Sequence, residues 1–79
     1  MKVDVADLIS IIEIFAKRDF PIASDSRLLE DGIIDSLNLV QIISEIEAKY
    51  DLKIGAMDIS FEDFESPALL AEALEKIFL

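Results

Sequence analysis

Apolar residues recur at helical spacing between residues 39 and 50, and this pattern constrains the fold more than any other feature of the chain. At about 100° per residue, five large side chains gather on one arc of a helix: Leu39, Ile42, Ile43, Ile46 and Tyr50. An arc of this width is typical of a helix that buries one stripe in a small bundle. The sequence therefore predicts an amphipathic helix that packs against the rest of the chain.

Asp35 and Ser36 mark the start of this helix. A carboxylate at the N-cap accepts the free amide hydrogens of the first turn, and its charge suits the positive end of the helix dipole. Ser36 then falls at the first helical position, where its hydroxyl projects into solvent. The preceding residues 29–34 are predicted to form a loop that turns at Gly32, a residue that tolerates a positive φ. A Ca²⁺ loop through Asp31 and Asp35 does not fit, because the alternating ligand spacing and the terminal Glu are missing.

A second strip of the same helix lies beside the buried stripe. It contains Ser36, Val40, Ser44 and Glu47, and Leu37 points away from the core next to the serine. One exposed Leu has little significance alone, but Leu37 and Val40 lie at the helix end that presents the hydroxyl. We interpret Leu37, Val40, Ser44 and Glu47 as a docking surface for partner proteins.

Two more segments before this helix have clear patterns. Residues 4–18 are predicted to form the first helix, with Lys17 and Arg18 at its carbonyl end. Its apolar face contains Leu8, Ile11, Ile12, Ile14 and Phe15. Pro21 prevents a helix from continuing, and residues 19–34 form a long connection. Because this connection has many apolar side chains, we expect it to pack on the core: Phe20, Ile22, Leu28, Leu29, Ile33 and Ile34.

The C-terminal third contains two further helix starts, after an irregular connector at residues 51–59. Ser60 can cap a short helix over residues 60–65, with Asp63 at the capping-box position. Ser66 is then a suitable N-cap for a last helix that begins at Pro67, the favoured residue for a first helical position. The apolar face of this helix, which runs to about Phe78, is predicted to contain Leu69, Leu70, Ala73, Leu74 and Ile77.

The composition supports an all-α fold. The 79 residues include two Gly, two Pro, no Cys and no His, so disulfides and thiolate metal sites are excluded and the commonest general base is missing. We predict one domain, residues 1–79, folded as a small four-helix bundle of three longer helices and one short helix with a long first loop. We predict no metal site.

The net charge is −10, from 17 acidic and 7 basic residues. This charge disfavours nucleic acid and anionic membranes, and it attracts basic patches on proteins; a role in solubility alone is the simpler alternative. The first seven residues do not resemble a signal peptide, and the apolar run at residues 8–16 is too short to span a bilayer. We expect a cytoplasmic monomer.

The loop and helix start together resemble the acyl carrier proteins. The matching residues are Asp31, Gly32, Asp35, Ser36 and Leu37, and the similarity extends over nearly the whole chain. The resemblance implies that Ser36 receives covalent 4′-phosphopantetheine from coenzyme A, with Asp35 and Leu37 beside it. It also implies a bundle that can shelter an acyl chain. The implied partners are a phosphopantetheinyl transferase, an acyl- or aminoacyl-loading ligase and downstream transferases.

The type of carrier depends on the surface of the second helix. Fatty-acid carriers are rich in acids there, whereas this chain has Asn38, Gln41, Ser44 and Ala48. The runs at residues 39–47 and 59–67 are similar to D-alanyl and other aminoacyl carriers. We therefore predict a non-catalytic carrier in a specialised pathway, such as an amino-acid, polyketide or modified-lipid pathway. The alternatives are a general fatty-acid carrier and an unmodified acidic adaptor that binds a basic protein.

Overall fold

The computed structural model describes residues 3–17, 21–55 and 58–77. They form three α-helices and one turn of 3-10 helix, in the order α1 (Val5–Phe15), α2 (Ser36–Tyr50), η1 (Phe61–Phe64) and α3 (Pro67–Ile77). No strand occurs within these ranges. The all-helical prediction is confirmed. The expected short fourth helix is a single 3-10 turn, so the bundle has three α-helices.

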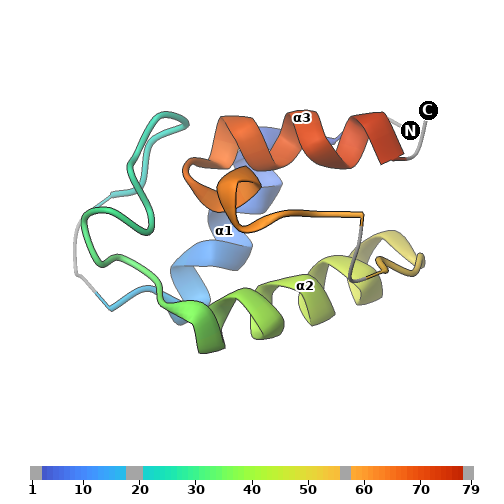
Figure 1. Ribbon diagram of the computed structural model, residues 1–79, viewed down its shortest axis with the longest axis horizontal. Helices are drawn as coiled ribbons and strands as arrows, with labels where there is room; N and C mark the ends of the chain where they lie inside the picture. The colour runs from blue at the N-terminus through green and yellow to red at the C-terminus, as the bar shows by residue number, and fades with distance from the viewer. Residues whose placement is uncertain (1–2, 18–20, 56–57, 78–79) are drawn as a thin grey trace.

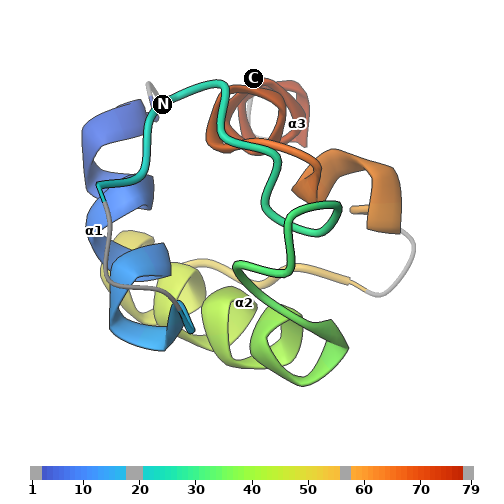
Figure 2. The ribbon, with the colours of Figure 1, turned by 90° about the vertical axis from the view of Figure 1, so that its left-hand side faces the viewer.

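The helix α1 packs against both α2 and α3, and η1 packs against α3. Figure 1 shows that α2 and α3 both begin at the end of the molecule where the loop of residues 21–35 lies. Figure 2 looks at this end and shows the loop crossing between the helices. The start of α2, the start of α3 and the loop therefore meet in one region.

The core is almost entirely aliphatic, with Phe64 as its one buried aromatic residue among the residues described. Full burial of one Leu or Ile side chain contributes about 1.5–3 kcal/mol relative to exposure. Aliphatic side chains with no exposed surface come from α1, the loop, α2 and α3: Leu8, Ile12, Leu28, Ile42, Ile46, Leu70 and Leu74. The predicted stripe of α2 is confirmed, because Ile42 and Ile46 are fully buried and its other three members pack against the core.

The long loop is fixed to the helices by its backbone as well as by its side chains. The Leu28 N–H donates to the Glu65 carbonyl at 3.0 Å, and the Ala68 N–H donates to the Ser24 carbonyl at 2.9 Å. Four of its apolar side chains are buried: Ile22, Leu28, Ile33 and Ile34. The prediction that this connection packs on the core is confirmed for these residues, whereas Asp19 and Phe20 lie outside the described residues.

The end of α1 and the buried stripe of α3 differ from expectation. The helix α1 ends at Phe15 rather than at residue 18, so Lys17 lies beyond it; Arg18 and Phe78 lie outside the described residues. The buried stripe of α3 is Pro67, Leu70, Ala71 and Leu74, at the spacing i, i+3, i+4, i+7. Leu69 falls beside this stripe and is 42% exposed.

The start of α3 predicted at Ser66 and Pro67 is confirmed, whereas Ser60 precedes only the 3-10 turn η1. The Ser66 hydroxyl oxygen accepts a hydrogen bond from the Leu69 N–H at 3.2 Å. The Ser60 N–H donates to the Asp63 carboxylate at 2.9 Å, as a capping box requires. Within the described ranges, every helix is too short or too polar to cross a membrane.

Candidate functional site

The N-terminus of α2 is built by a reciprocal capping box. The Asp35 carboxylate accepts the Asn38 N–H at 3.0 Å, and the Asn38 side-chain oxygen accepts the Asp35 N–H at 3.0 Å. These two bonds satisfy backbone donors that an uncapped helix leaves free. The predicted N-cap at Asp35 is confirmed, and Ser36 is the first helical residue.

The sequence reasoning placed Asn38 on the surface of the second helix and missed its part in the cap; its burial corrects that placement. Its side chain is buried, with 8% of its surface exposed, and its amide group donates to the Gln41 side-chain oxygen at 2.9 Å. A polar group buried in this way is held by hydrogen bonds rather than available to a partner. The available signal was the spacing Asp35-x-x-Asn38, which has the form of a capping box.

Lys17 adds an ion pair to the same cap. Its ammonium lies 2.7 Å from the Asp35 carboxylate, while its backbone N–H donates to the Ile33 carbonyl at 2.9 Å. The pKa of Asp35 is lowered below its ordinary value. The largest cause is the hydrogen bond from Lys17, and the next is the hydrogen bond from the Asn38 N–H. Asp35 is therefore an anion at neutral pH and a weak proton acceptor.

The turn before the cap needs its glycine. Gly32 has a φ of 69°, and a Cβ built on it would meet no atom within 4 Å. The backbone conformation, and not a lack of space, therefore selects glycine. The Gly32 N–H donates to the Leu29 carbonyl at 3.2 Å, and the next two amides both donate to the Leu28 carbonyl. This turn buries Ile33 and Ile34 and directs the chain into the cap.

Ser36 and its neighbours are open to solvent. The hydroxyl belongs to an exposed residue, and Leu37 and Val40 are 67% and 63% exposed. Ser44, one turn further along α2, is also exposed. The expected exposure of Leu37 beside the serine is confirmed, and an apolar surface adjoins the hydroxyl.

Glu47, the fourth residue of the predicted docking surface, has a structural contact. Its carboxylate accepts the Ile54 N–H at 2.8 Å, and its carbonyl accepts the Leu52 N–H at 3.1 Å. Its side chain is half-buried. Glu47 therefore fixes the connector after α2, and the structure does not place it with the open residues Leu37, Val40 and Ser44.

The Ser36 hydroxyl has no partner base among the groups described around it. A nucleophilic serine needs a base within hydrogen-bonding reach; the chain has no His, and the adjacent carboxylate of Asp35 is paired with Lys17. No group of three or more metal-binding side chains occurs in the described part of the chain. Ser36 therefore presents an exposed hydroxyl at the start of a capped helix.

A comparison with protein families gives a match over most of the chain. Residues 6–74 match the family model described as the phosphopantetheine attachment site. The matched region contains all but the first residue of α1, the loop, α2, η1 and the first eight residues of α3. The resemblance to carrier proteins, which the sequence shows at Asp31, Gly32 and residues 35–37, is confirmed.

Proposed function

The chain belongs to the family of phosphopantetheine attachment domains, and on this premise we propose that Ser36 bears the prosthetic group. Domains of this family are non-catalytic carriers to which 4′-phosphopantetheine is attached covalently. The observation that carries the proposal is the exposed hydroxyl of Ser36 at the first position of a capped helix.

The residues around Ser36 fit such an attachment. Asp35, Asn38 and Lys17 hold the helix start in one conformation through the cap and the ion pair. The exposed Leu37 and Val40 offer apolar contact to the enzyme that modifies the serine. Both the presentation of the hydroxyl and its surroundings therefore suit recognition by a phosphopantetheinyl transferase.

The role of this chain in the modification is that of a substrate. The Ser36 oxygen forms a phosphodiester with the phosphopantetheine part of coenzyme A, and the adenosine bisphosphate leaves. The hydroxyl proton passes to the transferase, because Asp35 is already paired and is a weak base. The attached group supplies a thiol that holds acyl or aminoacyl cargo as a thioester.

Intact mass spectrometry tests this proposal. The protein is incubated with coenzyme A and a broad-specificity phosphopantetheinyl transferase, in parallel with Ser36→Ala and the control Ser44→Ala. Ser44 is also exposed on α2, so this control tests the choice of serine. We expect one added phosphopantetheine in the wild type and in Ser44→Ala, and none in Ser36→Ala. No gain in any protein would favour the unmodified acidic adaptor.

We propose further that the carrier serves a specialised pathway, with aminoacyl cargo as the leading candidate. The surface of α2 supports this, because the only acids of that helix are Glu45 and Glu47 and it also has Lys49. Glu47 is engaged with the Ile54 N–H. A general fatty-acid carrier, which presents an acid-rich second helix, is the alternative.

The cargo is tested on protein isolated from its native cells. The chain is purified at low pH, which preserves thioesters, and its intact mass is compared before and after treatment with hydroxylamine. A hydroxylamine-sensitive added mass equal to an amino acid minus one water would support the aminoacyl carrier. A series of masses that differ by two-carbon units would instead identify a fatty-acid or polyketide carrier and would contradict the aminoacyl proposal.

A further inference from the structure

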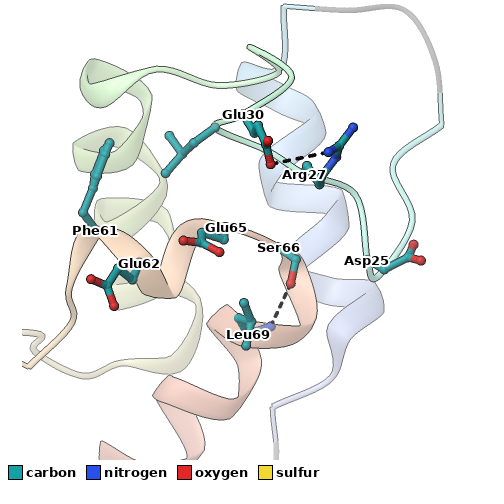
Figure 3. Close-up of a pocket in the computed structure, with 9 residues that line it drawn as sticks. Asp25, Arg27, Glu30, Phe61, Glu62, Glu65, Ser66 and Leu69 are labelled. Atoms are coloured by element: carbon teal, nitrogen blue, oxygen red, sulfur yellow. Dashed lines mark hydrogen bonds and ion pairs between the residues drawn. The ribbon is translucent and has the colours of Figure 1, made fainter.

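A hollow of about 560 Å³ opens between the loop, η1 and the start of α3, and its lining does not include Ser36. Figure 3 shows the loop residues Arg27 and Glu30 on one side and η1 with the start of α3 on the other. A second hollow of about 240 Å³ lies along α3 and shares Leu69 with the first. We call the two hollows together the η1–α3 groove.

The groove has an exposed apolar part. Leu29, Phe61 and Leu69 contribute to the lining of the larger hollow, and Phe61 and Leu69 are 53% and 42% exposed. Both belong to the small group of large apolar side chains that are exposed in the described part of the chain. Exposed apolar residues that gather in a hollow and are surrounded by polar residues are typical of a protein interaction site.

The rim of the groove is strongly acidic. The larger hollow has four carboxylates, those of Asp25, Glu30, Glu62 and Glu65, against the single cation Arg27. Arg27 already lies 3.5 Å from both Glu30 and Asp31. Glu62 and Glu65 form no ion pair with any residue that the structure describes. The smaller hollow adds the carboxylates of Asp58, Asp63 and Glu72 and one cation, Lys76.

The groove therefore has more acidic residues than the helix α2. The acids of α2 are limited to Glu45 and Glu47, and Lys49 offsets one of them. The larger hollow nevertheless lies at the same end of the molecule as the start of α2, because the loop that lines it leads into α2 (Figures 1 and 2). A partner that binds the larger hollow would therefore be at the end of the molecule where α2 begins.

We propose that the η1–α3 groove is a docking surface for a basic amphipathic segment of a partner protein. An apolar side chain of this segment contacts Phe61 and Leu69, and its Lys or Arg side chains lie against Glu62 and Glu65. The charge of the groove selects this occupant: a second copy of this chain, nucleic acid and an anionic membrane all bring negative charge to a negative rim. The inference does not depend on modification of Ser36.

An NMR titration of the whole, unmodified chain tests the proposal. The probe is a synthetic peptide in which Lys and Leu alternate at helical amphipathic spacing. A matched peptide with Ser in place of Leu has the same charge. We expect the Lys–Leu peptide to shift the amides of residues 25–31 and 60–69 selectively, with binding that weakens as salt is raised. We expect the Lys–Ser peptide to bind at least about tenfold more weakly, because it lacks the apolar contact.

Variants locate the contact. Phe61→Ala and Leu69→Gln should each weaken Lys–Leu peptide binding by about tenfold, as expected for anchor residues, and Glu62→Gln with Glu65→Gln should reduce its salt dependence. The matched controls are Ile14→Ala and Glu13→Gln on α1, which remove an exposed apolar side chain and an exposed carboxylate elsewhere. Circular dichroism verifies the fold of each variant, and Leu69→Gln replaces Phe61→Ala if the latter unfolds.

Three results would overturn the proposal. The first is a set of amide shifts centred on Leu37 and Val40 of α2. The second is equal binding of the Lys–Leu and Lys–Ser peptides, which would show attraction by charge alone. The third is unchanged affinity in folded Phe61→Ala and Leu69→Gln proteins.

Discussion

The Lys17 ammonium lies 2.7 Å from the carboxylate of Asp35, so the residue that follows α1 is linked to the cap that begins α2. The Lys17 backbone strengthens this link, because its N–H donates to the Ile33 carbonyl in the turn before the cap. The exposed Ser36 is the next residue along the chain. Its position relative to the bundle therefore depends on α1 as well as on its own helix.

The ion pair predicts a pH dependence of stability at acid pH. The pKa of Asp35 is lowered in the folded state, first by Lys17 and then by the Asn38 N–H. A lowered pKa contributes stability that is fully present above the unfolded-state pKa and is lost as the pH falls through the folded-state pKa. We expect Lys17→Gln to raise the pKa of Asp35 and to reduce this loss. Carbon NMR titration of the Asp35 carboxyl group measures the change.

The control for this experiment is Lys49→Gln, which removes a cation from the last turn of α2 and should leave the Asp35 titration unchanged. An Asp35 pKa that is the same in Lys17→Gln and wild type would show that the ion pair is not formed in solution.

The reciprocal cap predicts that Asn38 stabilises the fold. Asn38→Ala removes the acceptor for the Asp35 N–H and the donor to Gln41. We expect the free energy of unfolding to fall by about 1 kcal/mol, the usual size of a capping contribution. Urea unfolding measures it. Ser44→Ala, an exposed control in the same helix, should change stability by less than about 0.5 kcal/mol; equal effects of the two variants would contradict the role of Asn38.

Replacement of the two serines at helix starts, Ser36 and Ser66, should have different effects on the free energy of unfolding. Ser36 is the first helical residue and Asp35 provides the cap, so Ser36→Ala should change the free energy of unfolding by less than about 0.5 kcal/mol. The Ser66 hydroxyl caps α3 by accepting the Leu69 N–H, and Ser66→Ala should cost about 1 kcal/mol. Thermal and urea unfolding of both variants tests the contrast. Marked unfolding of Ser36→Ala would contradict its exposed position.

Local sequence signals predicted the helix starts and the buried stripe of α2. Caps and first-turn residues depend on hydrogen bonds that span two or three positions, so Asp35, Ser60 and Ser66 were visible in the sequence. The stripe of α2 depends only on the helical repeat. The site around Ser36 was predictable for the same reason, because its loop, cap and hydroxyl are consecutive in the chain.

Contacts between distant residues were not predictable in this way. The pairing of Lys17 with Asp35 depends on where α1 ends, and this helix stops earlier than its basic residues suggested. In α3 the apolar residues extend beyond one face, so periodicity alone did not decide between Leu69 and Ala71 as a member of the buried stripe. The bond from Ile54 to Glu47 depends on the path of an irregular connector.

The structural role of Glu47 can be tested separately from its expected role in partner docking. Its carboxylate accepts the Ile54 N–H at 2.8 Å. Glu47→Ala should increase the hydrogen-exchange rate of the Ile54 amide by about tenfold, since loss of one hydrogen bond of about 1.4 kcal/mol changes the opening equilibrium by that factor. Glu47→Gln removes the charge but retains an oxygen acceptor, so the Ile54 amide should remain protected. Equal exchange in both variants would contradict a structural role for this bond.

A second pair of variants, Glu47→Lys and Glu47→Gln, tests the expected contribution of Glu47 to partner binding. If its charge attracts a basic partner, Glu47→Lys and Glu47→Gln should both slow association and reduce its salt dependence, with the larger effect in Glu47→Lys. The phosphopantetheinyl transferase is a suitable partner for stopped-flow measurements. Association rates that are unchanged across salt concentrations would remove Glu47 from the docking surface and leave it with the connector.

The net charge of −10 predicts that salt stabilises the fold. Repulsion among carboxylates opposes the compact state, and raising ionic strength from about 0.01 M to about 1 M shortens the screening length from about 30 Å to about 3 Å. We expect the urea midpoint to rise over this range. A triple variant with Glu13→Gln, Asp25→Asn and Glu72→Gln removes three exposed negative charges and should show a smaller rise. An equal rise in both proteins would mean that the salt acts through general exclusion from the protein surface rather than through screening.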